Sequence, residues 1–72
     1  MNPTLTKGPV CIEVPALAEA AQLCIYDLNG RVVYRTEVPG GEATLLPYNF
    51  THKGIYMVKI IGQGNAVKVI VE

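Results

Sequence analysis

The dipeptide Asn29-Gly30 constrains this chain most, because it separates two apolar runs within residues 23–34. A two-residue loop between strands favours a type I′ turn, in which both central residues have positive φ. Asparagine tolerates that conformation and glycine adopts it freely. The sequence therefore predicts a β-hairpin at this point. Its predicted register pairs Leu28 with Arg31, Tyr26 with Val33 and Ile25 with Tyr34.

Further short apolar runs, separated by glycine and proline, have the alternating pattern of half-buried strands. Residues 16–22 alone have a helical composition, but they span barely two helical turns, so we predict a connection there. This pattern favours an all-β fold, a small antiparallel Ig-like β-sandwich of about six to seven strands. The predicted strands cover residues 10–14, 23–28, 31–38, 42–46, 54–61 and 67–72.

Two segments lack a strand pattern. Residues 1–9 are punctuated by Pro3, Gly8 and Pro9, so we expect the end of a leader or linker that cannot join a ladder, followed by one domain over residues 10–72. Pro47 is expected to end the strand before it, and residues 48–53 are expected to form an irregular loop. The predicted core consists of Val10, Ile12, Val14, Leu23, Ile25, Val32, Tyr34, Tyr56, Val58, Ile60, Val67, Val69 and Val71.

Composition narrows the classes of function. The 72 residues carry a formal net charge of zero, which argues against attraction to nucleic acid or to an anionic membrane surface. Half of the residues are apolar and 17% are charged, so the chain is not a disordered segment. It has one histidine and no serine, and its carboxylates are scattered. We therefore expect no enzyme, no cofactor and no metal site.

The two cysteines, Cys11 and Cys24, both lie in apolar runs. Their spacing matches no metal or redox motif. Buried thiols are the favoured interpretation, with one internal disulfide as the alternative. A nucleophilic pair with His52 is disfavoured, because the histidine lies in a predicted loop while both thiols lie in predicted core strands.

Four blocks of the sequence form a characteristic series. In order they are Asn2-Pro3-Thr4, Ile25-Tyr26-Asp27-Leu28-Asn29-Gly30-Arg31-Val32-Val33, Gly54-Ile55-Tyr56-Met57-Val58-Lys59-Ile60 and Lys68-Val69-Ile70-Val71-Glu72. Together they resemble the C-terminal sorting domain (type A) of cargo proteins exported by the type IX (Por) secretion system of Bacteroidetes-type bacteria. The resemblance extends over almost all of the chain. The leader before Gly8 is slightly longer than is usual in the family, and the two cysteines are unusual.

The resemblance implies a folded address label that is the last domain of a larger precursor. Such a domain directs an N-terminal cargo from the periplasm across the outer membrane to the cell surface. The implied partners are the outer-membrane translocon or shuttle and a sortase that removes the domain during surface attachment. No nucleic-acid partner is expected, and a homodimer through an edge strand is a further expectation.

Two surfaces are candidates for recognition. One is the hairpin tip, with Asn29, Gly30 and Arg31; the other comprises Gly54 and Lys59 of one strand together with Lys68, Ile70 and Glu72 of the last. The last strand is also expected to offer a free edge to a partner. On the simplest alternative, all of these residues contribute only to folding and none to recognition.

Two other functions remain open at this stage. An accessory carbohydrate- or protein-binding module of a secreted enzyme would use Tyr48 and Phe50 as an exposed platform near His52. The second open function is that of a purely structural spacer domain.

Overall fold

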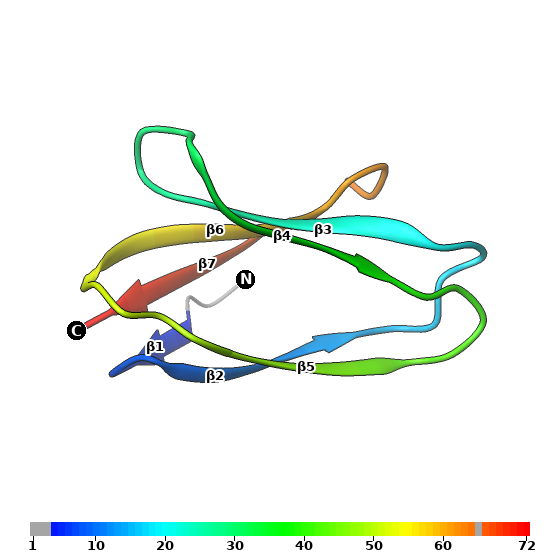
Figure 1. Ribbon diagram of the computed structural model, residues 1–72, viewed down its shortest axis with the longest axis horizontal. Coiled ribbons are helices and arrows are strands. Elements are labelled where there is room, and N and C mark those ends of the chain that lie inside the picture. Colours follow the sequence, from blue (N-terminus) through cyan, green and yellow to red (C-terminus); the bar gives the residue numbers. More distant parts are fainter. Residues whose placement is uncertain (1–3, 65) are drawn as a thin grey trace.

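Seven strands make up the part of the chain that the structure, a computed structural model, describes: residues 4–64 and 66–72. No helix occurs among these residues, and so none that could cross a membrane. The all-β prediction is confirmed. The strands are β1 (Thr4–Thr6), β2 (Pro9–Val14), β3 (Ala21–Tyr26), β4 (Val32–Val38), β5 (Thr44–Asn49), β6 (Gly54–Ile60) and β7 (Ala66–Val71) (Figure 1).

The strands form two sheets packed as a sandwich (Figure 1). The larger sheet has the order β1-β7-β6-β3-β4, and the smaller one consists of β2 and β5. The chain therefore crosses between the sheets four times: from β1 to β2, from β2 to β3, from β4 to β5 and from β5 to β6. All pairs are antiparallel except β1 with β7, which is parallel.

Strand β1 corrects the prediction that residues 1–9 cannot join a ladder. Thr4 and Thr6 lie opposite Val69 and Val71 of β7. The hydroxyl of Thr6 accepts a hydrogen bond from the Gly8 amide (3.1 Å), which stabilises the turn into β2. The prediction relied on Pro3 and Pro9, but neither proline lies within β1. All three residues of β1 therefore keep the backbone N–H groups that a short strand needs. Asn2 and Pro3 lie outside the described residues.

The turn between β3 and β4 is not of type I′. Among the described residues only glycines have positive φ, and in this turn that residue is Gly30 (φ 83°). The Gly30 amide donates to the Asp27 carbonyl (3.0 Å), and the Asp27 amide donates to the Arg31 carbonyl (2.9 Å). This is a longer loop than predicted, with a glycine in the left-handed conformation at its end.

The Asp27 carboxylate explains this turn. One oxygen, Oδ1, accepts hydrogen bonds from the amides of Asn29 (2.9 Å) and Arg31 (3.0 Å), an arrangement that favours an Asx-type turn. The register consequently shifts at a bulge after Ile25. Ile25 lies opposite Tyr34 as predicted, whereas Tyr26 lies opposite Val32 and not Val33.

Strand β5 passes through Pro47, which was predicted to end it. Cys11 of β2 lies opposite Pro47, and β5 has no strand on its other side. A proline at an edge removes no hydrogen bond when its missing N–H faces outward. Tyr48 and Asn49 therefore belong to a strand and not to the predicted loop.

The core lies between the sheets. Its most deeply buried members are Leu23 and Ile25, which have no exposed surface. Every predicted core residue is buried or half-buried except Val32, which is 43% exposed because the bulge displaces it from the inward alternation. Val38 and Phe50 were missed. The core cluster consists of Val14, Leu23, Ile25, Val38, Phe50, Val58, Val69 and Val71.

Candidate recognition surface

The outer face of the five-stranded sheet gathers three of the predicted site residues. Residues directly opposite each other in neighbouring strands point to the same face. Lys59 lies opposite Cys24 and Ala66, Lys68 lies opposite Met57, and Ile70 lies opposite Ile55. Lys59, Lys68 and Ile70 therefore share one face. The structure thus brings together residues that were selected from two separate strands.

This outer face combines one apolar row with basic side chains in the two other rows. Its apolar part includes Leu5 of β1, which is 64% exposed. Arg35 lies opposite Cys24 and adds a third cation to the two lysines. The rows that cross the face are Leu5–Ile70–Ile55, Lys68–Met57–Tyr26 and Ala66–Lys59–Cys24–Arg35.

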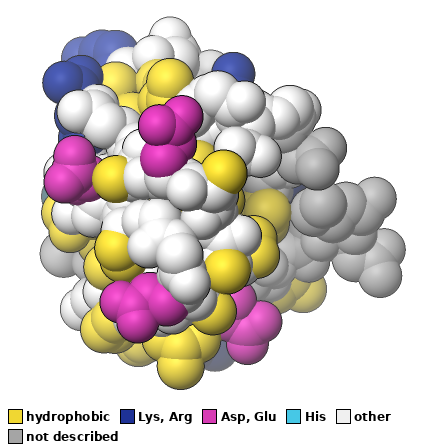
Figure 2. Space-filling view, turned by 90° about the vertical axis from the view of Figure 1, so that its right-hand side faces the viewer, with side chains coloured by type: hydrophobic (Ala, Val, Ile, Leu, Met, Phe, Trp, Pro, Cys, Tyr) yellow, Lys and Arg dark blue, Asp and Glu magenta, His cyan; other side chains and the backbone are white. Residues whose placement is uncertain are grey.

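Charge is distributed unevenly over the molecule. The loops that connect the two sheets carry Glu19 and Glu42, and both side chains are exposed. Figure 2 shows this end of the molecule, with acidic side chains spread over it and basic ones at its upper margin. The strands of the outer face also carry Glu37, which is exposed and lies opposite Gln22, but their three cations still give this face an excess of positive charge.

Cys24 is buried on this outer face, although it points away from the core. It is 4% exposed and lies between Arg35 and Lys59 on the adjacent strands. Hydrogen bonding with the Cys24 thiol raises the pKa of the neighbouring Tyr26 phenol. Cys11 is exposed on β2, contrary to the prediction of two buried thiols, and both cysteines are free.

The hairpin tip is a second exposed surface. Asn29, Gly30 and Arg31, one of the two candidate surfaces, are all exposed. The Arg31 amide, as a hydrogen-bond donor, lowers the pKa of the Asp27 carboxyl, and Arg31 Nε lies 3.4 Å from Asp27 Oδ2. Leu28, at 75% exposure, adds an apolar side chain that the sequence reasoning did not select.

The expected free edge of the last strand does not exist over Val69–Val71, because β1 pairs there. The Glu72 amide also donates to the Thr6 carbonyl (2.9 Å). Gly54 begins β6 opposite Val71, and its φ is 154°. This backbone conformation favours glycine, so the fold alone accounts for a glycine at this position. Glu72 is exposed just beyond β7.

The alternative binding platform is absent. Phe50 is 5% exposed, and its ring packs between those of Tyr48 (4.8 Å between centroids) and Tyr56 (4.5 Å). The predicted exposed pair of Tyr48 and Phe50 is therefore wrong. His52 donates or accepts one hydrogen bond with Thr51 (3.0 Å), and within residues 4–64 and 66–72 no cluster of His, Cys, Asp or Glu could hold a metal ion.

Comparison with known proteins gives one match. Residues 2–72 match the family described as secretion system C-terminal sorting domain. No curated protein and no solved structure matches the chain significantly. Because the match covers nearly every residue, the chain belongs to the family of secretion system C-terminal sorting domains.

Proposed function

We propose that the outer face of the five-stranded sheet is the surface by which the type IX secretion machinery recognises this sorting domain. The family is one of sorting signals and not of enzymes, and it implies export towards the cell surface as part of a larger precursor. A signal shared by different cargoes must present its own recognition surface. The observation that supports this face is the joint exposure of Lys59, Lys68 and Arg35 beside an apolar row that includes Leu5 and Ile70.

The chemistry of the face defines the partner. Apolar side chains such as Leu5 and Ile70 favour contact with an apolar patch, while the three cations favour acidic groups beside it. Charge complementarity of this kind speeds encounter and fixes orientation. The hairpin tip, with Asn29, Gly30 and Arg31, is the second candidate surface. Removal of the domain by a sortase after export belongs to the same proposal.

Export of a reporter tests this function. Residues 1–72 fused to a periplasmic reporter, in a bacterium that has this secretion system, should carry the reporter to the cell surface. Deletion of residues 68–72 should leave it in the periplasm. Failure of the intact fusion to leave the periplasm would overturn the sorting function.

A double variant tests the face. Lys68→Glu with Ile70→Thr leaves the inward valines of β7 unchanged, so the fold should persist while export falls. The matched control is Lys7→Glu with Leu45→Thr, which makes the same chemical changes at exposed positions away from the face. Normal export of the first variant would mean that the machinery reads the hairpin tip instead, and Arg31→Glu is then the next test.

A further inference from the structure

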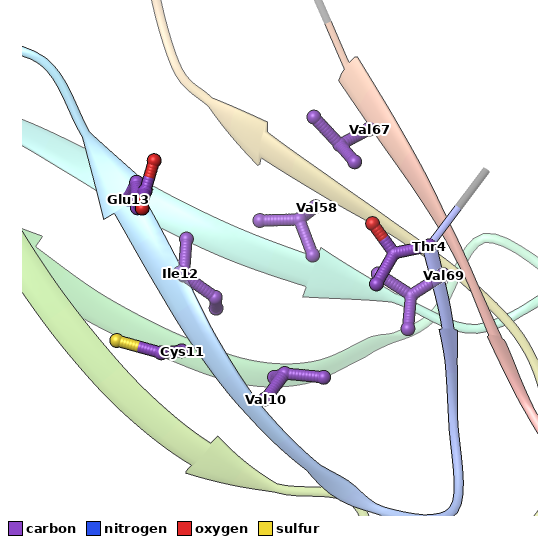
Figure 3. A pocket seen from close by; sticks show the side chains of 8 residues that line it. All are labelled: Thr4, Val10, Cys11, Ile12, Glu13, Val58, Val67 and Val69. Carbon is purple, nitrogen blue, oxygen red and sulfur yellow. The ribbon is translucent and has the colours of Figure 1, made fainter. Parts of the chain in front are cut away.

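A groove opens along β2, on the side of the sandwich where β2 has no neighbouring strand. Val10 and Ile12 of β2 face Val58 and Val69 of the larger sheet across a cavity of about 290 Å³, whereas Cys11 points away (Figure 3). A second cavity of about 230 Å³ extends the groove towards Leu17, Leu23 and Ile60 and shares Ile12, Val58 and Val67 with the first. Val10, Ile12 and Val67 consequently remain only half-buried although they point inward.

The Pro9 carbonyl at the start of the β2 edge accepts a hydrogen bond from the Thr6 hydroxyl (2.6 Å), and beyond it the edge above this groove has backbone groups that no described residue pairs. The Phe50 amide donates to the Gly8 carbonyl (2.9 Å), which makes residues 8 and 50 a hydrogen-bonded pair of the β2–β5 ladder. Hydrogen-bonded pairs alternate along an antiparallel ladder. The amides and carbonyls of Cys11 and Glu13 therefore point away from β5, towards the open edge.

The four edges of the two sheets differ in how they resist pairing. Strand β1 has three residues, β4 carries a bulge and the charged side chains Arg35 and Glu37, and β5 contains Pro47. Each of these is a recognised device against edge-to-edge pairing. Strand β2 has six residues, a proline only at its first position and no bulge. Among the strands of the described residues it is the long edge with the fewest such devices, a first-position proline and the charged Glu13, and it lies above an apolar groove.

We propose that the β2 edge and its groove receive an extended segment of a secretion-machinery protein, which adds to the small sheet as a third strand. This inference rests on the proposed sorting function. Backbone groups of Cys11 and Glu13 would hold the segment, and its alternate side chains would enter the groove. Small apolar residues fit a groove lined by valines, and a lysine or arginine fits the exposed Glu13 carboxylate.

A proline at Cys11 tests the backbone contact. Cys11→Pro removes an N–H that β5 does not use, so the sandwich should retain its fold while export to the surface falls roughly ten-fold, the order expected for a lost edge hydrogen bond with added steric conflict. Cys11→Ala keeps the N–H and should export normally. Leu45→Pro, which removes an outward-facing N–H from the edge of β5, should also export normally.

A groove-filling variant separates recognition from stability. Val67→Phe places a larger side chain in the groove, so the thermal midpoint should stay the same or rise while export falls. Thermal unfolding of each purified variant verifies that the fold persists. If the parent fusion reaches the surface and the folded Cys11→Pro and Val67→Phe variants do so equally well, the groove proposal is overturned and the sorting function stands. If the parent fusion itself stays in the periplasm, the sorting function fails.

Two measurements on the isolated domain test whether something other than a machinery protein occupies the β2 edge. Slow hydrogen exchange at the Cys11 and Glu13 amides of a monomer would mean that the chain's own residues already fill the edge. A dimer that Cys11→Pro converts to a monomer would identify a second copy as the occupant. Either result overturns the assignment to the machinery; fast exchange in a monomer, with an export defect in both variants, supports it.

Discussion

The two lateral sides of the sandwich are packed differently: aromatic rings fill one side, whereas an apolar groove stays open along β2 on the other. On the β4–β5 side, Tyr34 packs against Tyr48 with 4.7 Å between ring centroids, and Phe50 and Tyr56 continue the row. The Tyr56 hydroxyl donates to the His52 carbonyl (2.8 Å), which keeps its polar end satisfied. On the β2 side, valine and isoleucine face one another across the groove.

Side-chain size accounts for this difference. An aromatic side chain buries about 150–250 Å², enough to span the distance between two sheets roughly 10 Å apart. Valine is shorter, and two facing valines leave room at an unpaired edge. We therefore expect stability to be concentrated on the aromatic side, whereas the open side has surface available for binding.

The largest expected effect comes from the centre of the aromatic row. Phe50→Ala should lower the free energy of unfolding by about 3–5 kcal/mol, because it removes a buried ring and leaves a cavity between Tyr48 and Tyr56. Denaturant titration of the purified domain measures this loss. The variant is expected to be largely unfolded, since a domain of this size has little stability to lose.

The matched change on the open side is Ile12→Ala, with an expected loss of about 1–2 kcal/mol because the side chain is only half-buried. The difference between the two variants measures the asymmetry of the sandwich. Equal losses would show that the groove contributes to stability as much as the aromatic row does.

An effect of similar size is expected at the hairpin that positions β4, the strand which supplies Tyr34. Gly30→Val should lower the free energy of unfolding by about 1–3 kcal/mol, because a β-branched residue resists the positive φ at this position. A Cβ atom there would meet nothing within 4 Å, so the loss reports backbone strain alone. Gly30→Asn should lose less. Parent-like melting of Gly30→Val would contradict the turn.

The smallest expected effect is a pH dependence at the same hairpin. The Asp27 carboxyl accepts hydrogen bonds from the amides of Arg31 and Asn29, which lower its pKa below the ordinary 3.8. Its contribution to stability is therefore fully present above the unfolded-state pKa and is lost as the pH falls through the folded-state pKa. Denaturation curves at acidic pH, with Asp27→Asn as the control, should show a loss in the parent that the variant lacks.

Much of the fold could be predicted from local patterns. Alternation in residues 54–61 and 67–72 placed the inward side chains correctly, and the short length of residues 16–22 excluded a helix. The outward positions Lys59, Lys68 and Ile70 follow from the same alternation. Their meeting on one face depends on β6 and β7 being neighbours, and the addition of Arg35 depends on β4 lying in that same sheet.

The errors arose where a distant or competing contact decided the outcome. The Asp27 side chain changed the turn, and with it the exposure of Val32. β1 forms because the last strand of the chain offers it an edge. Pro47 lies within a strand because that side of β5 is unpaired.

Local patterns specify that this chain forms short amphipathic strands, because alternation and turn residues act over a few neighbouring positions. The four family blocks are equally local, and they are sufficient to indicate a sorting domain. Long-range packing, in contrast, sets which strand edges stay open, which face carries the cations and which side the aromatic rings close. Strand order is set by contacts between residues far apart in the chain, and local periodicity carries no information about those partners.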